Sequence, residues 1–149
     1  MKLFDHVKAN GSTLHLKGLL GNGGVHAHSD HLFAILRTAK DAGIEKVAIH
    51  VYTDGRDTAP QSSAQFLREL EAEIAKIGVG FIATASGRFF AMDRDNNWDR
   101  VKKAEDALFE CKGSVCQPGA LPSDVVAKLH AQGIMDEHLE PIIFVDESG

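Results

Sequence analysis

Three short polar stretches of this sequence carry side chains that can bind an anion and exchange a proton. They are GGVHAH at residues 23–28, DGRD at residues 54–57 and GRFFAMDRD at residues 87–95. Each one comes directly after an apolar run that has the length and composition of a strand. Loops held in place by regular elements are where binding and catalytic residues concentrate, so these three stretches are the first candidates for a functional site.

The first stretch places two histidines after a pair of glycines. Glycine permits backbone conformations closed to other residues and lets a ligand approach closely. His26 follows this permissive turn directly, and the residues alone leave two interpretations open: a functional imidazole, or one satisfied by local structure. For His28 we favour the structural interpretation. His15 and His50 lie inside strand-like runs and are interpreted as core or edge histidines.

The second stretch, DGRD, sets opposite charges side by side where a strand is expected to end. A carboxylate next to a guanidinium stays ionised and well oriented, which suits proton exchange with a substrate hydroxyl. Arg56 and Asp57 are therefore candidate site residues. A turn fastened by a local ion pair explains this tetrapeptide equally well.

The third stretch carries Arg88 and Arg94. A guanidinium is a planar fork that matches phosphate or carboxylate oxygens in two-point contact, and the glycine before Arg88 leaves room for a ligand. With Arg56, three arginines fall in strand-end loops of an acidic chain. This arrangement favours a local anion site over arginines that merely face solvent.

The composition limits the classes of protein to consider. The 149 residues are 44% hydrophobic and 25% charged, which is typical of a single globular domain, residues 1–149. A formal charge of −5 argues against binding to nucleic acid or to an anionic membrane. No stretch approaches the ~20 apolar residues of a membrane span, so we expect a cytoplasmic protein. Cys111 and Cys116 supply too few thiolates for a structural zinc site and are expected to be reduced.

The elements that must position the three loops repeat a strand and helix pattern. Apolar runs predict strands at residues 14–20, 46–52 and 80–85. Helical periodicity predicts three helices: one from Ser29 or Asp30 to Gly43, one from Ser62 or Ser63 to Gly78, and one whose apolar side is Trp98, Val101, Ala104 and Leu108. We expect loops at 86–97 and 111–122, a helix at 123–132 and a last strand at 141–145.

This alternation predicts an α/β fold, with a mainly parallel sheet flanked by helices in αβα layers. In open parallel sheets, ligands bind outside the carboxyl ends of the strands. The three polar loops should therefore meet at one edge of the sheet. We predict one cleft there, lined by His26, Arg56, Asp57, Arg88 and Arg94.

The loops and their flanks resemble a known family in order and spacing. The segments LHLKGLLGNGGVHAHSDHLFAIL, HVYTDGRDTAP and ATASGRFFAMDRDNNWDRV are similar to the transferase domain of the cofactor-independent (2,3-bisphosphoglycerate-independent) phosphoglycerate mutases. The resemblance covers residues 12–146. In that family a second domain, of the alkaline-phosphatase type, carries a nucleophilic serine and two manganese ions.

The resemblance implies that the complete enzyme interconverts 3-phosphoglycerate and 2-phosphoglycerate in glycolysis and gluconeogenesis. The phosphatase-domain serine would take the phosphoryl group while the transferase domain holds and reorients the glycerate. By this resemblance His26 would bind the substrate and assist catalysis. Arg56 and Asp57 would hold the glycerate, with Asp57 as general acid and base. Arg88 and Arg94 would clamp carboxylate and phosphate.

The sequence departs from the family pattern in a few places. Ala27 stands where serine is common, Asn22 where aspartate is common, and Phe89 and Phe90 where tyrosines are common, so some hydrogen bonds around the site are expected to be missing. Two further family arginines, in an RADR motif, do not occur before the sequence ends at DESG, and no stretch resembles the phosphatase half. We therefore expect no cofactor in this chain, the manganese ions in the phosphatase domain as its partner, and no mutase activity from the chain alone.

Two other functions remain open from the residues. The pattern H-x-H after a strand, with a distant aspartate, can bind zinc and would fit a metal-dependent hydrolase. The chain could also be a non-catalytic module that binds an organophosphate. Stoichiometric zinc in the purified chain would favour the hydrolase.

Overall fold

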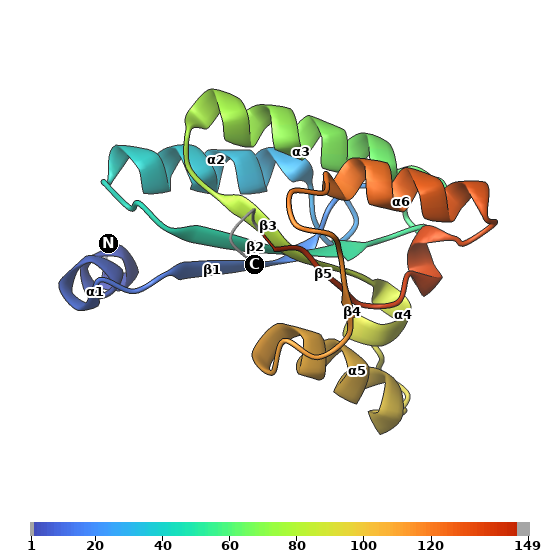
Figure 1. The fold of residues 1–149 in the computed structure, drawn as a ribbon. Coiled ribbons are helices and arrows are strands. Elements are labelled where there is room, and N and C mark those ends of the chain that lie inside the picture. Colours follow the sequence, from blue (N-terminus) through green and yellow to red (C-terminus); the bar gives the residue numbers. More distant parts are fainter. Residues whose placement is uncertain (1, 146–149) are drawn as a thin grey trace.

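The computed structural model, which describes residues 2–145, is organised around a five-stranded sheet in the order β1-β2-β3-β5-β4 (Figure 1). Met1 and residues 146–149 lie outside the described part, so the predicted domain and the resemblance both extend slightly beyond it. Neighbours β1, β2 and β3 are parallel, β5 is antiparallel to β3, and β4 is parallel to β5. The strands are β1 (Leu14–Leu19), β2 (Val47–Thr53), β3 (Phe81–Gly87), β4 (Ser114–Val115) and β5 (Ile142–Ile143).

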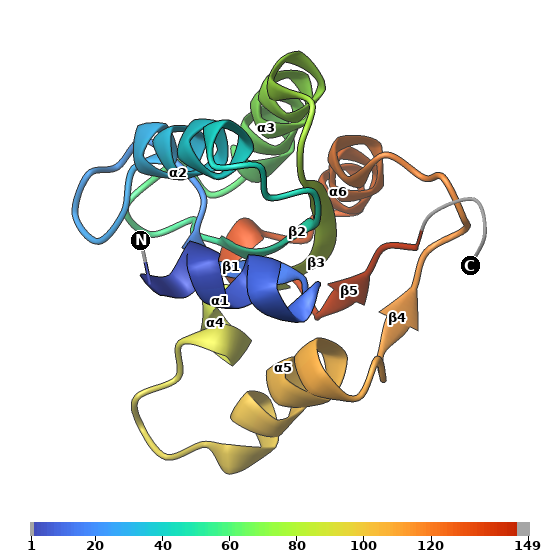
Figure 2. The same cartoon turned by 90° about the vertical axis from the view of Figure 1, so that its left-hand side faces the viewer.

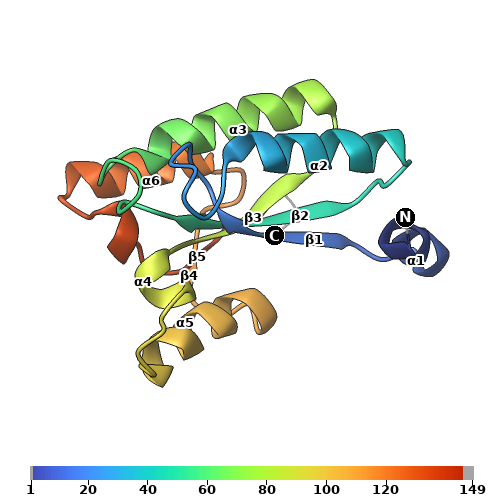
Figure 3. The same ribbon diagram turned by 180° about the vertical axis from the view of Figure 1, so that it is seen from behind.

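Helices flank the sheet on both sides, which confirms the predicted α/β class. One face is covered by α2 (Ser29–Asp41), α3 (Ser63–Ile77) and α6 (Pro122–Ala131), as Figures 1 and 3 both show. The short α4 (Arg88–Ala91) and α5 (Trp98–Phe109) lie on the other side. Helix α1 (Lys2–Asn10) packs beside the start of β1 (Figure 2), and a 3-10 turn, η1 (Asp136–His138), precedes β5.

The core forms between β2 and the helices α2 and α3 that cover one face of the sheet. Val47, Ile49 and Val51 alternate along β2 and therefore share one face, and each is at most 2% exposed. Leu36 of α2 and Leu67 of α3 are completely buried in the same cluster. Burial of each such side chain contributes roughly 1.5–3 kcal/mol to folding, so this layer anchors the three loops that leave the strand ends.

The opposite face of the three parallel strands carries a chain of polar side chains. His15 Nδ1 lies 2.9 Å from His50 Nε2, and His50 Nδ1 lies 3.0 Å from Thr84 Oγ1, so one hydrogen-bonded chain crosses β1, β2 and β3. Burial, helped by the nearby positive charge of His15 and Lys17, lowers the pKa of His50 to about 4. The structure thus places His50 in the interior and His15 at the exposed edge strand.

Several predicted boundaries are wrong. The expected loop 86–97 contains the end of β3 and all of α4, which begins at Arg88 directly after the strand and buries Phe90. The expected loop 111–122 contains β4, and the strand expected at 141–145 is reduced to two residues of β5. Trp98 is 70% exposed, so the buried side of α5 centres on Ala107 instead. Helix α1 was not predicted.

Candidate functional site

The three polar loops meet at the carboxyl ends of β1, β2 and β3 and enclose a pocket of about 390 Å³. All five predicted site residues line it, together with a second group from the third loop and α5. The lining residues are His26, Arg56, Asp57, Arg88, Phe89, Met92, Asp93, Arg94, Asp95 and Arg100. The structure therefore brings together every residue that the strand-end argument selected.

Asp54 organises the DGRD loop from inside. Its Oδ1 accepts hydrogen bonds from the backbone N–H groups of Arg56 and Asp57, both at 3.2 Å, which turns the chain so that the Arg56 and Asp57 side chains reach the pocket. The same oxygen lies 2.6 Å from Arg88 Nη1. Burial opposes ionisation of Asp54, but the hydrogen bonds from Arg88 and from the loop outweigh it, so the pKa of Asp54 lies below its ordinary value.

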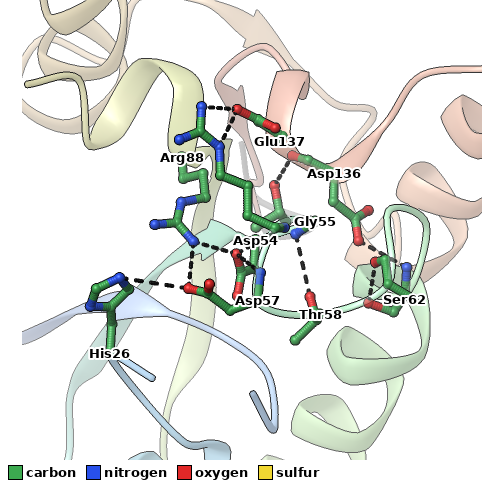
Figure 4. A network of polar contacts seen from close by, with 12 residues as sticks. His26, Asp54, Gly55, Asp57, Thr58, Ser62, Arg88, Asp136 and Glu137 are labelled. Atoms are coloured by element: carbon green, nitrogen blue, oxygen red, sulfur yellow. Dashed lines mark hydrogen bonds and ion pairs between the residues drawn. The ribbon is translucent and has the colours of Figure 1, made fainter. Parts of the chain in front are cut away.

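Arg88 holds two carboxylates together at the floor of the pocket. Its Nη1 donates to Asp54 Oδ1 and, at 2.8 Å, to Asp57 Oδ2, and its side chain is only 11% exposed (Figure 4). Burial alone would lower the pKa of Arg88, but the hydrogen bonds that Arg88 donates to the two aspartates raise it above its ordinary value. Arg88 thus orients Asp57, a contact that the residue types alone did not indicate.

His26 stands on the other side of Asp57, with its Nε2 3.6 Å from Asp57 Oδ2 (Figure 4). The two loops approach closely because Gly23 has no side chain: a Cβ there would lie 2.6 Å from the Asp57 carbonyl oxygen. His28 has a different partner, since its Nδ1 accepts from the N–H of Asp30 and caps α2. The structural interpretation of His28 therefore fits its position.

The third loop adds a second basic group at the mouth of the pocket. Asp93 accepts from the N–H groups of Asp95 and Asn97 and lies 3.4 Å from Arg100 Nη1, which fixes the loop to the start of α5. The Arg100 guanidinium also stacks 3.8 Å above the Phe89 ring. Arg94 projects into the pocket lining and, among residues 2–145, is paired with no carboxylate. Sequence reasoning missed Arg100, which lies beyond the third stretch, in the first turn of α5.

A fourth segment, residues 136–139, was not predicted to belong to the site. Glu137 pairs with Arg56 through Nε at 2.5 Å and also through Nη2. The hydrogen bond from Arg56 is the main reason that the pKa of Glu137 lies below its ordinary value. The segment joins β3 as well, because Gly87 N–H donates to the Leu139 carbonyl at 2.7 Å.

Within residues 2–145, no group of three or more His, Cys, Asp or Glu side chains is arranged to hold a metal ion. His26 and His28 face different partners, so the H-x-H pair does not form a shared ligand site in this conformation. Over the same range, no helix is both long and apolar enough to cross a membrane.

A mainly parallel sheet with an arginine-lined pocket at its strand ends defines an α/β domain that has its candidate site where such sheets bind ligands. The family model described as BPG-independent PGAM N-terminus (iPGM_N) matches residues 1–149. The chain therefore belongs to this family, the N-terminal part of the 2,3-bisphosphoglycerate-independent phosphoglycerate mutases, which confirms the resemblance seen in the sequence.

Individual relatives agree with this assignment. The 2,3-bisphosphoglycerate-independent phosphoglycerate mutase of Thermomicrobium roseum is 47% identical over 148 residues, which cover 99% of this chain and 28% of that enzyme. The enzyme of the same description from Listeria innocua is 47% identical over 144 residues, 97% of this chain and 28% of that enzyme. A crystal structure of Leishmania mexicana phosphoglycerate mutase at low cobalt concentration matches with a TM-score of 0.84 and 29% identity, over 99% of this chain and 31% of that one. The chain thus spans about 28% of the length of these curated relatives.

Proposed function

We propose that residues 1–149 form the substrate-binding transferase domain of a cytoplasmic phosphoglycerate mutase. The domain would hold glycerate while the phosphoryl group moves between the 3- and 2-hydroxyl groups, in glycolysis and gluconeogenesis. The observation that carries the proposal is the convergence of His26, Arg56, Asp57, Arg88 and Arg94 on one pocket. Membership of the mutase family supports 3-phosphoglycerate or 2-phosphoglycerate as the substrate of that pocket.

The arginines divide the work of binding. Arg88 is nearly buried and paired with Asp54 and Asp57, so its main contribution is to hold the floor of the pocket. Arg94 has no described carboxylate partner and is exposed, which leaves its full fork of donors for a phosphate or carboxylate group. We assign to Arg94 the first contact with the anion and to Arg56 a supporting contact from the facing loop.

Asp57 is placed to exchange protons with a hydroxyl group of the glycerate. Arg88 fixes one carboxylate oxygen, and the side chain remains 24% exposed at the pocket surface. A carboxylate so oriented acts as general base when a hydroxyl attacks and as general acid when the oxygen leaves. His26, on the far side of Asp57, would bind the same hydroxyl region and help to carry the proton.

The manganese ions that the resemblance implies find no fitting ligand set among the described residues. Their role, stabilisation of charge during phosphoryl transfer, belongs to the phosphatase domain of the same enzyme, which we propose as the partner of this chain. No step assigned here to Asp57, His26 or the arginines passes through a metal ion.

Binding and turnover measured on the 149-residue chain test the proposal. We expect 3-phosphoglycerate, titrated by calorimetry, to bind weakly and without added metal, and we expect no conversion to 2-phosphoglycerate. Restored to a complete enzyme with its serine-bearing domain, the same chain should support turnover. If 3-phosphoglycerate and 2-phosphoglycerate fail to bind the chain at millimolar concentration, while an unrelated organophosphate binds at the pocket, the proposed substrate is wrong.

A further inference from the structure

We propose that Glu137 is a positioning residue for Arg56, which it holds by one edge so that the other edge faces the anion. The inference rests on the proposed function of the pocket. It concerns a residue outside the three strand-end loops, contributed by a turn 81 positions further along the chain.

The contact between Arg56 and Glu137 leaves part of the guanidinium free. Arg56 contacts Glu137 Oε1 through Nε and through Nη2, so the carboxylate occupies the side edge of the guanidinium. A guanidinium has a second edge, formed by its two terminal nitrogens, that can make a further two-point contact. An arginine held by its side edge can therefore bridge a fixed carboxylate and a ligand.

Arg56 and Glu137 differ in how far their side chains are exposed to solvent. The Arg56 side chain is 53% exposed, whereas Glu137 is 17% exposed. A long exposed arginine loses considerable rotamer entropy when it is fixed on a ligand, so a partner that fixes it beforehand improves binding. Glu137 is the more buried, and hence the better held, member of the pair.

Glu137 is held because its neighbour Asp136 is locked into the interior. Asp136 is 1% exposed, and its Oδ2 accepts from the N–H groups of Ser62 and Ser63, both at 2.8 Å. Its Oδ1 accepts from Ser63 Oγ and lies 2.6 Å from His130 Nε2. Figure 4 shows Asp136 directed toward Ser62 while Glu137 lies beside the DGRD loop.

Two glycines bring the loops against the backbone of this turn. A Cβ on Gly55, within DGRD, would lie 3.0 Å from the N atom of Glu137. A Cβ on Gly87, before Arg88, would overlap the Glu137 carbonyl and lie 2.7 Å from the N atom of Leu139. The turn at 136–138 thus contacts both arginine-bearing loops, and Glu137 extends from it to Arg56.

A double-mutant cycle on the 149-residue chain tests the inference. We expect Glu137→Ala to weaken 3-phosphoglycerate binding roughly tenfold, within the range of coupling between contacting residues, and Glu137→Gln to weaken it less. In an Arg56→Ala background, Glu137→Ala should cause no further loss. Glu140→Ala, which removes a carboxylate 66% exposed and paired with Lys103, is the matched control and should bind like the wild type.

The opposite results would overturn the inference. Tighter binding by Glu137→Ala would mean that Glu137 competes with the anion for Arg56, and an equal loss in both backgrounds would mean a purely structural role. Solvent exchange of the Arg56 Nε–H, followed by NMR without any ligand, is a readout that does not depend on the substrate. Slow exchange in the wild type and fast exchange in Glu137→Ala support positioning even if 3-phosphoglycerate does not bind; equal exchange rates refute it.

Discussion

Asp57 occupies a position that is unusual for a surface carboxylate, because three different elements determine its surroundings. The loop after β2 provides the residue, Arg88 at the start of α4 donates to its Oδ2, and His26 before α2 approaches the same oxygen. The Arg88 guanidinium is nearly buried, whereas the His26 imidazole is half exposed. Asp57 is thus oriented by one neighbour and open to the pocket beside the other, which supports its proposed role as general acid and base.

Replacement of Asp57 should separate binding from chemistry. In a complete mutase that carries this chain, we expect Asp57→Asn to retain the fold and most substrate binding while turnover falls roughly 10²–10⁴-fold, because a general acid–base is lost. Asp41→Asn makes the same change of charge on the exposed end of α2 and should leave steady-state rates unchanged. Wild-type turnover by Asp57→Asn would reduce Asp57 to a residue that fastens the turn.

Replacement of Arg94 should instead affect binding first. Arg94→Ala removes a guanidinium that has no described carboxylate partner, so the loss of its charge-assisted contact with the anion, worth roughly 1.5–3 kcal/mol, should raise KM on the order of tenfold or more. The turnover number should change much less. Arg68→Ala, on the exposed side of α3, is the control. A fall in kcat at constant KM would assign Arg94 to the chemical step.

Which residues approach the pocket was predictable, but their pairings were not. His26, Asp57 and Arg94 could be selected because parallel strands deliver their following loops to one edge. Arg88 turns inward because it pairs with Asp54. The sequence of a loop does not specify which carboxylate an arginine will contact. Glu137 was missed because it lies in the polar stretch GIMDEHLEP, which follows no strand and shows no motif.

At the scale of the elements, the polar chain that crosses β1, β2 and β3 makes the stability of the sheet dependent on pH. His50 stays neutral in the folded chain, with its pKa lowered to about 4, whereas a histidine in the unfolded chain has the ordinary pKa of 6.5. Between these values the unfolded state binds a proton that the folded state does not. The contribution of neutral His50 to the free energy of unfolding is therefore fully present above pH 6.5, and it declines as the pH falls toward 4.

We expect this decline to reach roughly 3 kcal/mol at pH 4, since one proton corresponds to about 1.4 kcal/mol per pH unit. Urea unfolding at several pH values between 4 and 7 measures it. His50→Gln retains an amide that can hydrogen-bond to Thr84 but cannot titrate, so its stability should vary less over this range. If the free energy of unfolding varies equally with pH in the wild type and in His50→Gln, the pH dependence belongs to another group.

The junction of β3 with the turn at 136–138 should be the least tolerant of added volume. Gly87→Ala places a methyl group against the Glu137 and Leu139 backbone, where no flexible side chain can move aside, so we expect a loss of roughly 3 kcal/mol or more. Gly18→Ala on β1, where a Cβ meets nothing within 4 Å, is the control and should be nearly neutral. Thermal unfolding of both variants measures this difference. Equal unfolding temperatures for Gly87→Ala and Gly18→Ala would show that the close backbone contact at Gly87 does not limit stability.

The three strand-loop-helix units and helix α6 were predictable from the sequence, whereas α1, α4, η1 and β4 were not, and β5 is shorter than the predicted strand. Strands β4 and β5 are two residues long, which is too short to produce an alternating pattern. The antiparallel direction of β5 depends on the route of the chain around α5 and α6. Helix α1 has nine residues and buries only Phe4 and Val7, which is a small apolar face from which to recognise a helix in the sequence.

At the scale of the whole molecule, a chain of net charge −5 carries a pocket with four arginines in its lining. We expect phosphate or sulfate at high concentration to occupy the Arg56, Arg88 and Arg94 cluster and to raise the unfolding temperature, because a ligand that binds only the folded state stabilises it. Chloride at equal ionic strength should stabilise less. The shift should persist in EDTA; a shift abolished by EDTA and restored by zinc would instead favour the metal-dependent hydrolase.

The turn at 136–138 also determines when during folding the pocket can appear. Thr53 Oγ1 donates to the Asp136 carbonyl across 83 positions of sequence, and Arg56 meets Glu137 across 81. Contacts of such wide separation close large loops and form slowly compared with the local contacts of each strand-helix unit. During synthesis from the N-terminus, both arginine-bearing loops leave the ribosome well before the segment that fixes them. Strands β1, β2 and β3 with helices α2 and α3 can therefore assemble first, and the pocket is completed only when the turn at 136–138 is in place.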